Sequence, residues 1–236
     1  MRPGQLAAAG ILSIALAWAP SRAAATDIRA AKAPAELDDR ALKIGSRTLR
    51  LPPGRWRLMQ RDMFLTPSRG DHQDVDVYGA WAVWLDDDAE PRMIVHLTLP
   101  LSDAPRLRRW DVDPCTKNPN QLRHRLTSGH QENECLEVLA VPDLFARLGG
   151  DGSLIAHWLA TRRGRGVESA VEIVYAVRSD TSYARMELFL PAATFESDDD
   201  ASAWANAMGD AVLPLFAGKV DSVLLPAPQD RAAPPP

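Results

Sequence analysis

Cysteine is scarce in this chain of 236 residues, and no long apolar run occurs after residue 25. Cys115 and Cys135 are the only cysteines. Their spacing excludes the C-x-x-C redox motif and does not fit the paired knuckles of common zinc sites. A membrane-spanning helix needs about 20 consecutive apolar residues. The chain after residue 25 is therefore predicted to be soluble and to have no transmembrane helix.

The motifs of several enzyme classes are also missing. The sequence contains no G-x-S-x-G, no S-x-x-K and no H-E-x-x-H, the local signatures of several serine hydrolases and zinc proteases. A glycine-rich stretch at 149–153 precedes a predicted helix, where backbone N–H groups can bind phosphate. It lacks the Gly-Lys-Ser/Thr ending of a phosphate-binding loop. We interpret it as a turn between two helices.

The first 25 residues have the pattern of a signal peptide. Arg2 provides the positive end, an apolar run follows at 6–19, and the alanines at 23–25 fit a cleavage site before Thr26. The apolar run is short for a membrane span. We therefore predict that residues 1–25 are removed on export.

The chain without this peptide is acidic. Loss of Arg2 and Arg22 takes the formal net charge from −4 to −6. This balance gives no broad attraction to nucleic acid or anionic lipid, so nucleic acid is not expected as a partner. Arginine greatly outnumbers lysine, and alanine and proline are abundant. The composition is typical of a GC-rich bacterial gene, which together with the leader predicts a periplasmic or secreted protein.

Cys115 and Cys135 are predicted to form a disulfide. An isolated pair in an oxidising compartment is normally joined, and closing a loop of about 20 residues contributes roughly 3 kcal/mol of stability. A zinc site is the alternative, because His124 and His130 lie in the same loop and would complete four ligands. The spacing of these residues favours the disulfide.

Alternating apolar residues predict strands along much of the chain. Segments 75–85 and 92–99 have the period of two that a strand requires, and the acidic stretch 86–91 joins them as a hairpin loop. The hairpin 169–191 repeats the pattern. One face of that hairpin is apolar, and the other carries Glu172, Arg178, Arg185 and Glu187.

Three helices complete the predicted fold. Two short ones begin near Asp143 and Ser153, and a third begins at 198–200, where acidic residues suit the helix dipole. Trp204 lies on the apolar stripe of the third helix and is predicted to be buried with Met186. The expected class is α+β, an antiparallel sheet of about five to seven strands with the short helices and the C-terminal helix on one face.

The domain boundaries follow from composition. Residues 46–225 are predicted to form a single α+β domain. Residues 26–45 lack clear periodicity and are interpreted as a linker. Residues 226–236 are rich in alanine and proline and are predicted to be a disordered tail.

Three acidic clusters are candidate cation sites. The segment 71–76 starts like a calcium loop, but it departs from that pattern at Tyr78 and Leu85. We interpret it as a polar loop that leads into a strand. The runs 86–88 and 198–200 are explained as a hairpin tip and a helix start. No metal site and no cofactor are assigned.

Two histidines and two groups of arginines are further candidates. His96 lies within an apolar strand pattern and is interpreted as a hydrogen-bonded core residue. His157 lies beside Trp158 on a predicted helix and is ambiguous. Arginines at 106–109 and 162–165 offer an anion-binding patch, although nearby acidic residues favour solvated turns.

These observations favour a non-catalytic binding or accessory module, with no catalytic residue assigned. A long polar loop held at both ends by a disulfide loses less entropy on meeting a partner. The candidate contact residues are Trp110, Arg123, His124 and Arg125. The expected partner is a protein or a component of the cell envelope.

The alternative is a hydrolase or metal-dependent enzyme whose residues are scattered in the sequence. Its candidate residues are His72 with Asp71 and Asp74, or His124 with His130. Convergence of several histidines with acidic residues in one pocket would favour this alternative.

Overall fold

The computed structural model describes residues 25–69, 74–101, 109–110, 121–126, 132–149, 153–162, 168–179 and 183–228. The predicted signal peptide, apart from Ala25, lies outside these residues, as does the tail from residue 229 onward. Within the described part of the chain, no helix has the length and apolar character needed to cross a membrane.

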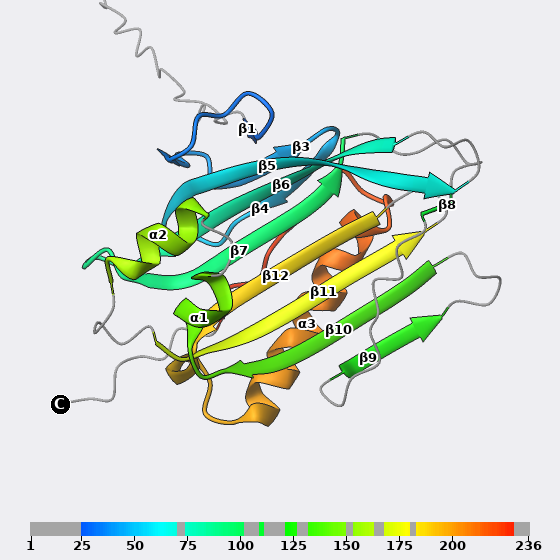
Figure 1. Ribbon diagram of the computed structural model, residues 1–236. Coiled ribbons are helices and arrows are strands. Elements are labelled where there is room, and N and C mark those ends of the chain that lie inside the picture. Colours follow the sequence, from blue (N-terminus) through cyan, green and yellow to red (C-terminus); the bar gives the residue numbers. More distant parts are fainter. Residues whose placement is uncertain are drawn as a thin grey trace, which may run out of the picture.

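The largest element is an antiparallel sheet (Figure 1). Its seven longer strands lie in the order β5-β6-β7-β12-β11-β10-β9, and two-residue strands β2 and β8 both pair with β5. The bounds are Ala35–Glu36 (β2), Arg55–Arg69 (β5), Asp74–Leu85 (β6), Pro91–Pro100 (β7), Arg109–Trp110 (β8), Gln121–Leu126 (β9), Glu132–Val141 (β10), Ala170–Ser179 (β11) and Tyr183–Pro191 (β12). The predicted α+β class with an antiparallel sheet is confirmed.

Both faces of this sheet are buried along its central strands. On β6, Ala82 and Trp84 belong to one hydrophobic core, whereas Trp81 and Val83 belong to another. Because successive residues of a strand point to opposite faces, the sheet separates the two cores. The predicted alternation of 75–85 is therefore present, and both of its faces are used for packing.

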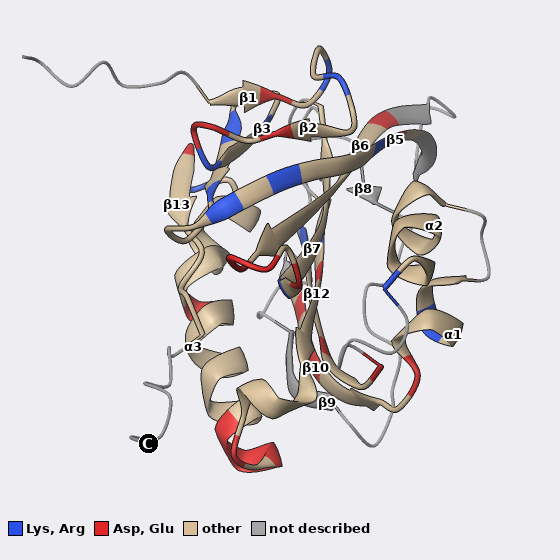
Figure 2. Cartoon of the chain, turned by 90° about the vertical axis from the view of Figure 1, so that its left-hand side faces the viewer, with Lys and Arg blue, Asp and Glu red and all other residues tan. Residues whose placement is uncertain are grey.

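Helices cover the two faces of the sheet (Figure 2). Helix α3, Asp198–Phe216, packs on one face with Met208, Val212 and Phe216 fully buried. Helices α1, Leu144–Gly149, and α2, Leu154–Ala160, pack in the other core. The C-terminal helix is where it was expected, but the short helices lie on the opposite face from it. An apolar stripe shows that a helix is buried and does not show against which face.

Serine side chains cap the starts of α2 and α3. The Ser153 hydroxyl accepts a hydrogen bond from the N–H of Ala156 at 3.2 Å, and Ser197 caps α3 in the same way through Asp200. Each cap pairs an N–H group that has no partner within the helix. A short 3-10 helix, η1 (Ala192–Thr194), connects the end of β12 to the segment before α3.

Trp204 is less buried than predicted. It lies at the edge of the α3 core, partly exposed, with its ring centroid 6.0 Å from that of Phe195. Its indole N–H donates to the carbonyl of Ala227 at 3.1 Å. Met186, predicted to be buried with it, is fully buried. The helix turns the side chains of Ala205 and Met208 toward the sheet, which leaves Trp204 at the rim.

A small mixed sheet is built from the two ends of the described chain. Its order is β1-β3-β4-β13, with β1 and β13 parallel to their neighbours. The bounds are Thr26–Asp27 (β1), Ala41–Ile44 (β3), Arg47–Arg50 (β4) and Ser222–Leu224 (β13). Segment 26–45, expected to be a linker, is instead part of the fold, because Ile28 and Leu42 are fully buried in the same core as α3.

Candidate functional site

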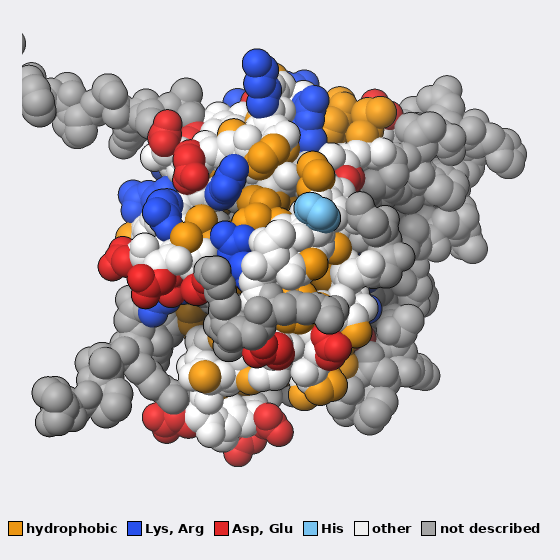
Figure 3. Space-filling model, turned by 60° about the vertical axis from the view of Figure 1, so that its left-hand side comes forward, with side chains coloured by type: hydrophobic (Ala, Val, Ile, Leu, Met, Phe, Trp, Pro, Cys, Tyr) orange, Lys and Arg blue, Asp and Glu red, His pale blue; other side chains and the backbone are white. Residues whose placement is uncertain are grey.

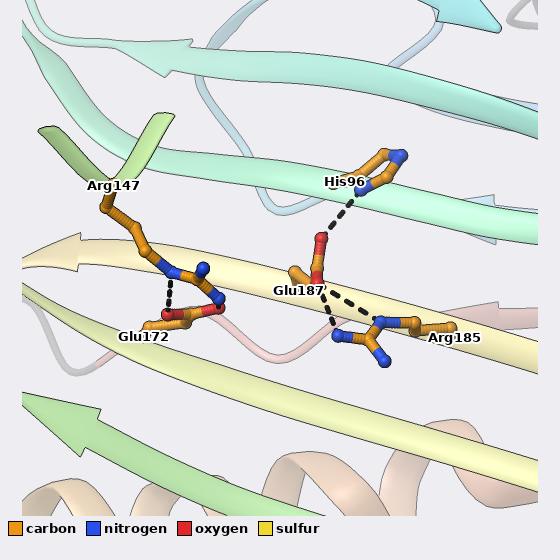
Figure 4. A network of polar contacts seen from close by, with 5 residues as sticks. All are labelled: His96, Arg147, Glu172, Arg185 and Glu187. Atoms are coloured by element: carbon orange, nitrogen blue, oxygen red, sulfur yellow. Dashed lines mark hydrogen bonds and ion pairs between the residues drawn. The ribbon is translucent and has the colours of Figure 1, made fainter. Parts of the chain in front are cut away.

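Three polar side chains meet near the centre of the main sheet, on the face that carries α1 and α2 (Figure 4). His96 of β7 lies 2.7 Å from Glu187 of β12, measured from Nδ1 to Oε2. The other carboxylate oxygen, Oε1, accepts from Arg185 at 2.6 Å and 3.1 Å, from Nη2 and Nε respectively. We call these three residues the central polar cluster.

Strand register brings this cluster together. His96 pairs directly with Glu187 across β7 and β12, and Arg185 lies two residues from Glu187 on the same face. On the other side of β7, His96 pairs with Trp81 of β6. The imidazole stacks on the Trp81 indole with 4.0 Å between ring centroids and 3° between planes. The histidine ring is thus fixed by a stacked ring and a hydrogen bond.

The ionisation of Glu187 depends on its two partners, His96 and Arg185. Burial opposes the charged form of Glu187, but hydrogen bonds and charge from His96 and Arg185 outweigh it and lower the pKa of Glu187 to about 2. Desolvation also opposes the charged form of Arg185, yet Glu187 keeps its pKa above the ordinary value. Because an ionised carboxylate only accepts hydrogen bonds, His96 Nδ1 carries the proton in this contact.

The second ring nitrogen of His96 faces a glycine. A Cβ atom built on Gly79 would lie 3.3 Å from His96 Nε2 and 3.4 Å from the Cβ of Asp62. Asp62 belongs to β5 and pairs with Gly79, and its Oδ1 accepts from the Gln60 amide at 2.8 Å. Among the described residues, Nε2 makes no hydrogen bond. This nitrogen therefore retains hydrogen-bonding capacity toward an added molecule.

A second ion pair on the same face fastens α1 to the sheet. The guanidinium of Arg147 donates two hydrogen bonds of 2.8 Å to the carboxylate of Glu172, which is 1% exposed. The hydrogen bonds from Arg147 and its attraction to Glu172 raise the pKa of Arg147 above its ordinary value. A buried carboxylate held in this bidentate way is a structural connection.

The predicted contact residues do not lie in an irregular loop. Arg123, His124 and Arg125 are consecutive residues of β9, paired with Leu136, Cys135 and Glu134 of β10. Strand β9 ends the sheet in the part of the chain that the structure describes, because β10 is the one strand that pairs with it there. These polar residues form a strand because their backbone pairs with the edge of β10.

Trp110 belongs to a different strand from the other three predicted contact residues. It belongs to β8, where it pairs with Ser68 of β5. Its backbone position therefore depends on the long β5–β6 hairpin and not on β10. The expectation that Trp110 adjoins the three β9 residues at one surface has no support in this strand pairing.

Of the two cysteines predicted to form a disulfide, only Cys135 is among the described residues. Cys115 lies outside the described residues, so its pairing with Cys135 stays a prediction. Cys135 belongs to β10, is 2% exposed and lies opposite Ala176 of β11. Cys135 therefore lies within β10, which begins three residues earlier at Glu132.

The residues of the enzyme alternative are not assembled within the described chain. Asp71, His72 and His130 lie outside it, and Asp74 is the first residue of β6. Among the described residues, no group of three or more histidine, cysteine and acidic side chains is placed to hold a metal ion. The proposed convergence of several histidines is not seen in this part of the molecule.

The other sequence candidates have ordinary structural places. Residues 86–88 form the turn between β6 and β7, where Asp86 accepts from the N–H of Glu90 at 2.8 Å. Residues 198–200 form the first turn of α3. His157 is exposed on α2, and the guanidinium of Arg162 lies 3.9 Å from the Trp158 ring. Arg106 and Arg108 lie outside the described residues.

Sequence reasoning assigned no function to His96 and Glu187, which are 91 residues apart. The available signals were that His96 is a polar residue within an apolar strand pattern and that Glu187 lies on the polar face of its hairpin. The comparisons with known proteins add no further residue. No family model matches this chain, and no curated protein and no solved structure matches it.

Proposed function

We propose that this chain is an exported, non-catalytic binding or accessory module that contacts a protein or cell-envelope component through segment 115–135. The observation that carries the proposal is the position of β9, Gln121–Leu126, at the end of the main sheet. An end strand presents a row of backbone N–H and C=O groups to which another chain can add a strand.

A partner strand added to β9 would form backbone hydrogen bonds with it, and its side chains would lie next to those of β9. Arg123, His124 and Arg125 supply hydrogen-bond donors along β9, and arginine is enriched at the energetic centres of interfaces. The predicted disulfide between Cys115 and Cys135 would limit the conformations of the segment before binding, which reduces the entropy lost on association.

The central polar cluster fits the same proposal. Its charged groups are paired with one another, since both oxygens of Glu187 are engaged by His96 and Arg185. Such pairing stabilises the sheet from which β9 extends. The cluster therefore serves as a structural element in a binding module.

The binding surface is tested by changing Arg123, His124 and Arg125 to serine while keeping both cysteines. The variant is expected to melt near the wild-type temperature and to lose the partners that the wild type captures from envelope extract. The matched control changes Arg50 and Arg55 to serine, which also removes two positive charges from exposed strand positions. Retention of every partner by the β9 variant, or equal loss by the control, would refute the proposed surface.

Export and the disulfide are tested together by intact-mass measurement of natively exported protein. The expected product begins at Thr26, and its mass is lower by two hydrogens than that of the chain with two free thiols. The loss of two hydrogens reflects oxidation of Cys115 and Cys135. A product that begins at Met1 would contradict export, and a mass with two free thiols would contradict the disulfide.

An enzyme is the second candidate, favoured by one observation. His96 has Nδ1 bonded to a carboxylate and Nε2 facing Gly79, which is the arrangement of a histidine general base. A general base contributes about 10²–10⁴ to a rate. Hydrolysis of p-nitrophenyl acetate by wild type and by His96→Asn separates the two candidates. The binding proposal predicts equal rates, and a loss of about 100-fold in the variant would favour the enzyme.

A further inference from the structure

Two hollows lie side by side at the start of α3, away from the residues of β10 that pair with β9. Both are lined by Phe195 and Glu196. The first, of about 390 Å³, also has Trp204 and Asp200 in its wall. The second, of about 470 Å³, is lined largely by apolar residues at the ends of β10 and β11. We call them the aromatic hollow and the apolar hollow.

The wall of the aromatic hollow is held in place. The rings of Phe195 and Trp204 meet at 47°, and the indole N–H of Trp204 is fixed by the Ala227 carbonyl. Asp200 accepts from the N–H of Glu196 at 3.2 Å, which fixes the approach to the helix. The two rings therefore form a corner whose π-faces can attract a cation within about 6 Å.

The described residues that line the two hollows carry charge of one sign. Glu196 and Asp200 line the aromatic hollow, Glu196 and Asp198 line the apolar hollow, and no lysine or arginine is among the described residues of either lining. Figure 2 shows the acidic residues gathered at this end of α3, and Figure 3 shows acidic side chains along the lower part of the molecule's surface. The surface is complementary to a cationic group next to an apolar one.

We infer that the two hollows bind an extended peptide of a partner protein that carries an arginine and, two positions away, an apolar residue. The guanidinium lies against Trp204 and Phe195, where its planar shape suits stacking and carboxylate contact. The apolar side chain enters the neighbouring hollow, because residues two apart on an extended chain share a face. This surface is separate from β9, which pairs with residues 133–137 of β10.

The probe is the peptide Ac-Gly-Arg-Ser-Leu-Gly-NH2, added to the full exported chain labelled with ¹⁵N. The expected result is a saturable shift of the Trp204 indole N–H signal. Trp204→Leu is expected to weaken binding roughly tenfold through loss of the cation–π contact, followed in this variant from the backbone amide signals of Glu196 and Asp200. Glu196→Gln is expected to weaken it through loss of a carboxylate, and it provides a second variant that leaves the α3 core unchanged.

The controls separate recognition from general attraction. The same peptide with citrulline in place of arginine keeps the shape and loses the charge, so it is expected not to bind. Asp199→Asn removes an exposed charge from the same helix turn, outside both linings, and is expected to keep wild-type affinity. Absence of a shift up to about 10 mM peptide, equal binding of the citrulline peptide, or equal weakening by Asp199→Asn would each overturn the inference.

Discussion

Replacing Phe216 by alanine is expected to lower the free energy of unfolding by about 3–5 kcal/mol. Phe216 is fully buried near the end of α3, and its ring stacks on Tyr175 of β11 with 5.6 Å between centroids. Loss of the Phe216 ring would leave a cavity beside Tyr175, whose hydroxyl donates a hydrogen bond to Glu134 at 2.9 Å. Urea denaturation followed by far-UV circular dichroism measures the effect.

Trp204→Ala is the matched comparison on the same helix. Because Trp204 is partly exposed, its removal deletes less buried surface, and the expected loss is about 1–2 kcal/mol. An effect of Trp204→Ala as large as that of Phe216→Ala would contradict the packing of α3 described above.

Changing Glu187 to glutamine is expected to destabilise the protein by about 3 kcal/mol, because Arg185 and His96 then lose the charge of a carboxylate that is only 15% exposed. For a domain of this size, the melting temperature should fall by roughly 10 °C. The control is Asp87→Asn, the same chemical change at an exposed residue of the turn between β6 and β7. It should change stability by less than about 0.5 kcal/mol.

The effect of Glu187→Gln also has a defined pH dependence. The pKa of Glu187 is about 2 in the folded protein and 4.5 without the fold. A lowered pKa means that the carboxylate contributes stability above pH 4.5 and that this contribution is lost as pH falls toward 2. The difference corresponds to about 3 kcal/mol. The gap between wild type and Glu187→Gln should therefore close in acid, and a gap that persists at pH 2 would contradict the ionised pair.

Strong local patterns predicted the central strands. The alternation at 75–85, at 92–99 and in the hairpin 169–191 corresponds to β6, β7, β11 and β12, because the period of two directly reflects which side chains are buried. The starts of α2 at Ser153 and of α3 at 198–200 could also be predicted, because serine capping and acidic residues in the first turn are local interactions.

Long-range pairing could not be predicted from the sequence. Strand β13 pairs with β4 although most of the sequence lies between the two strands, and Ser222 lies opposite Thr48. The strands within 26–45 are also only two to four residues long, too short for a periodic signal, and the sequence alone therefore predicts a linker there. Strand β9 is polar and pairs with β10, and its sequence alone predicts a loop.

The central polar cluster shows the same limit. The sequence placed Arg185 and Glu187 on the polar face of their hairpin and His96 within an apolar strand. The contact between His96 and Glu187 depends on β7 lying next to β12 in the sheet. The order of strands is set by tertiary packing, and no short motif encodes it.

Hydrogen exchange of the complex with the captured partner tests the central claim most directly. Amides of 121–126 are expected to exchange more slowly in the complex, because a partner strand would engage the edge of β9 that does not pair with β10. Amides of β7 and β12 around the central polar cluster should exchange at the same rate with and without partner. Protection confined to β7 and β12, with no change at 121–126, would contradict the account.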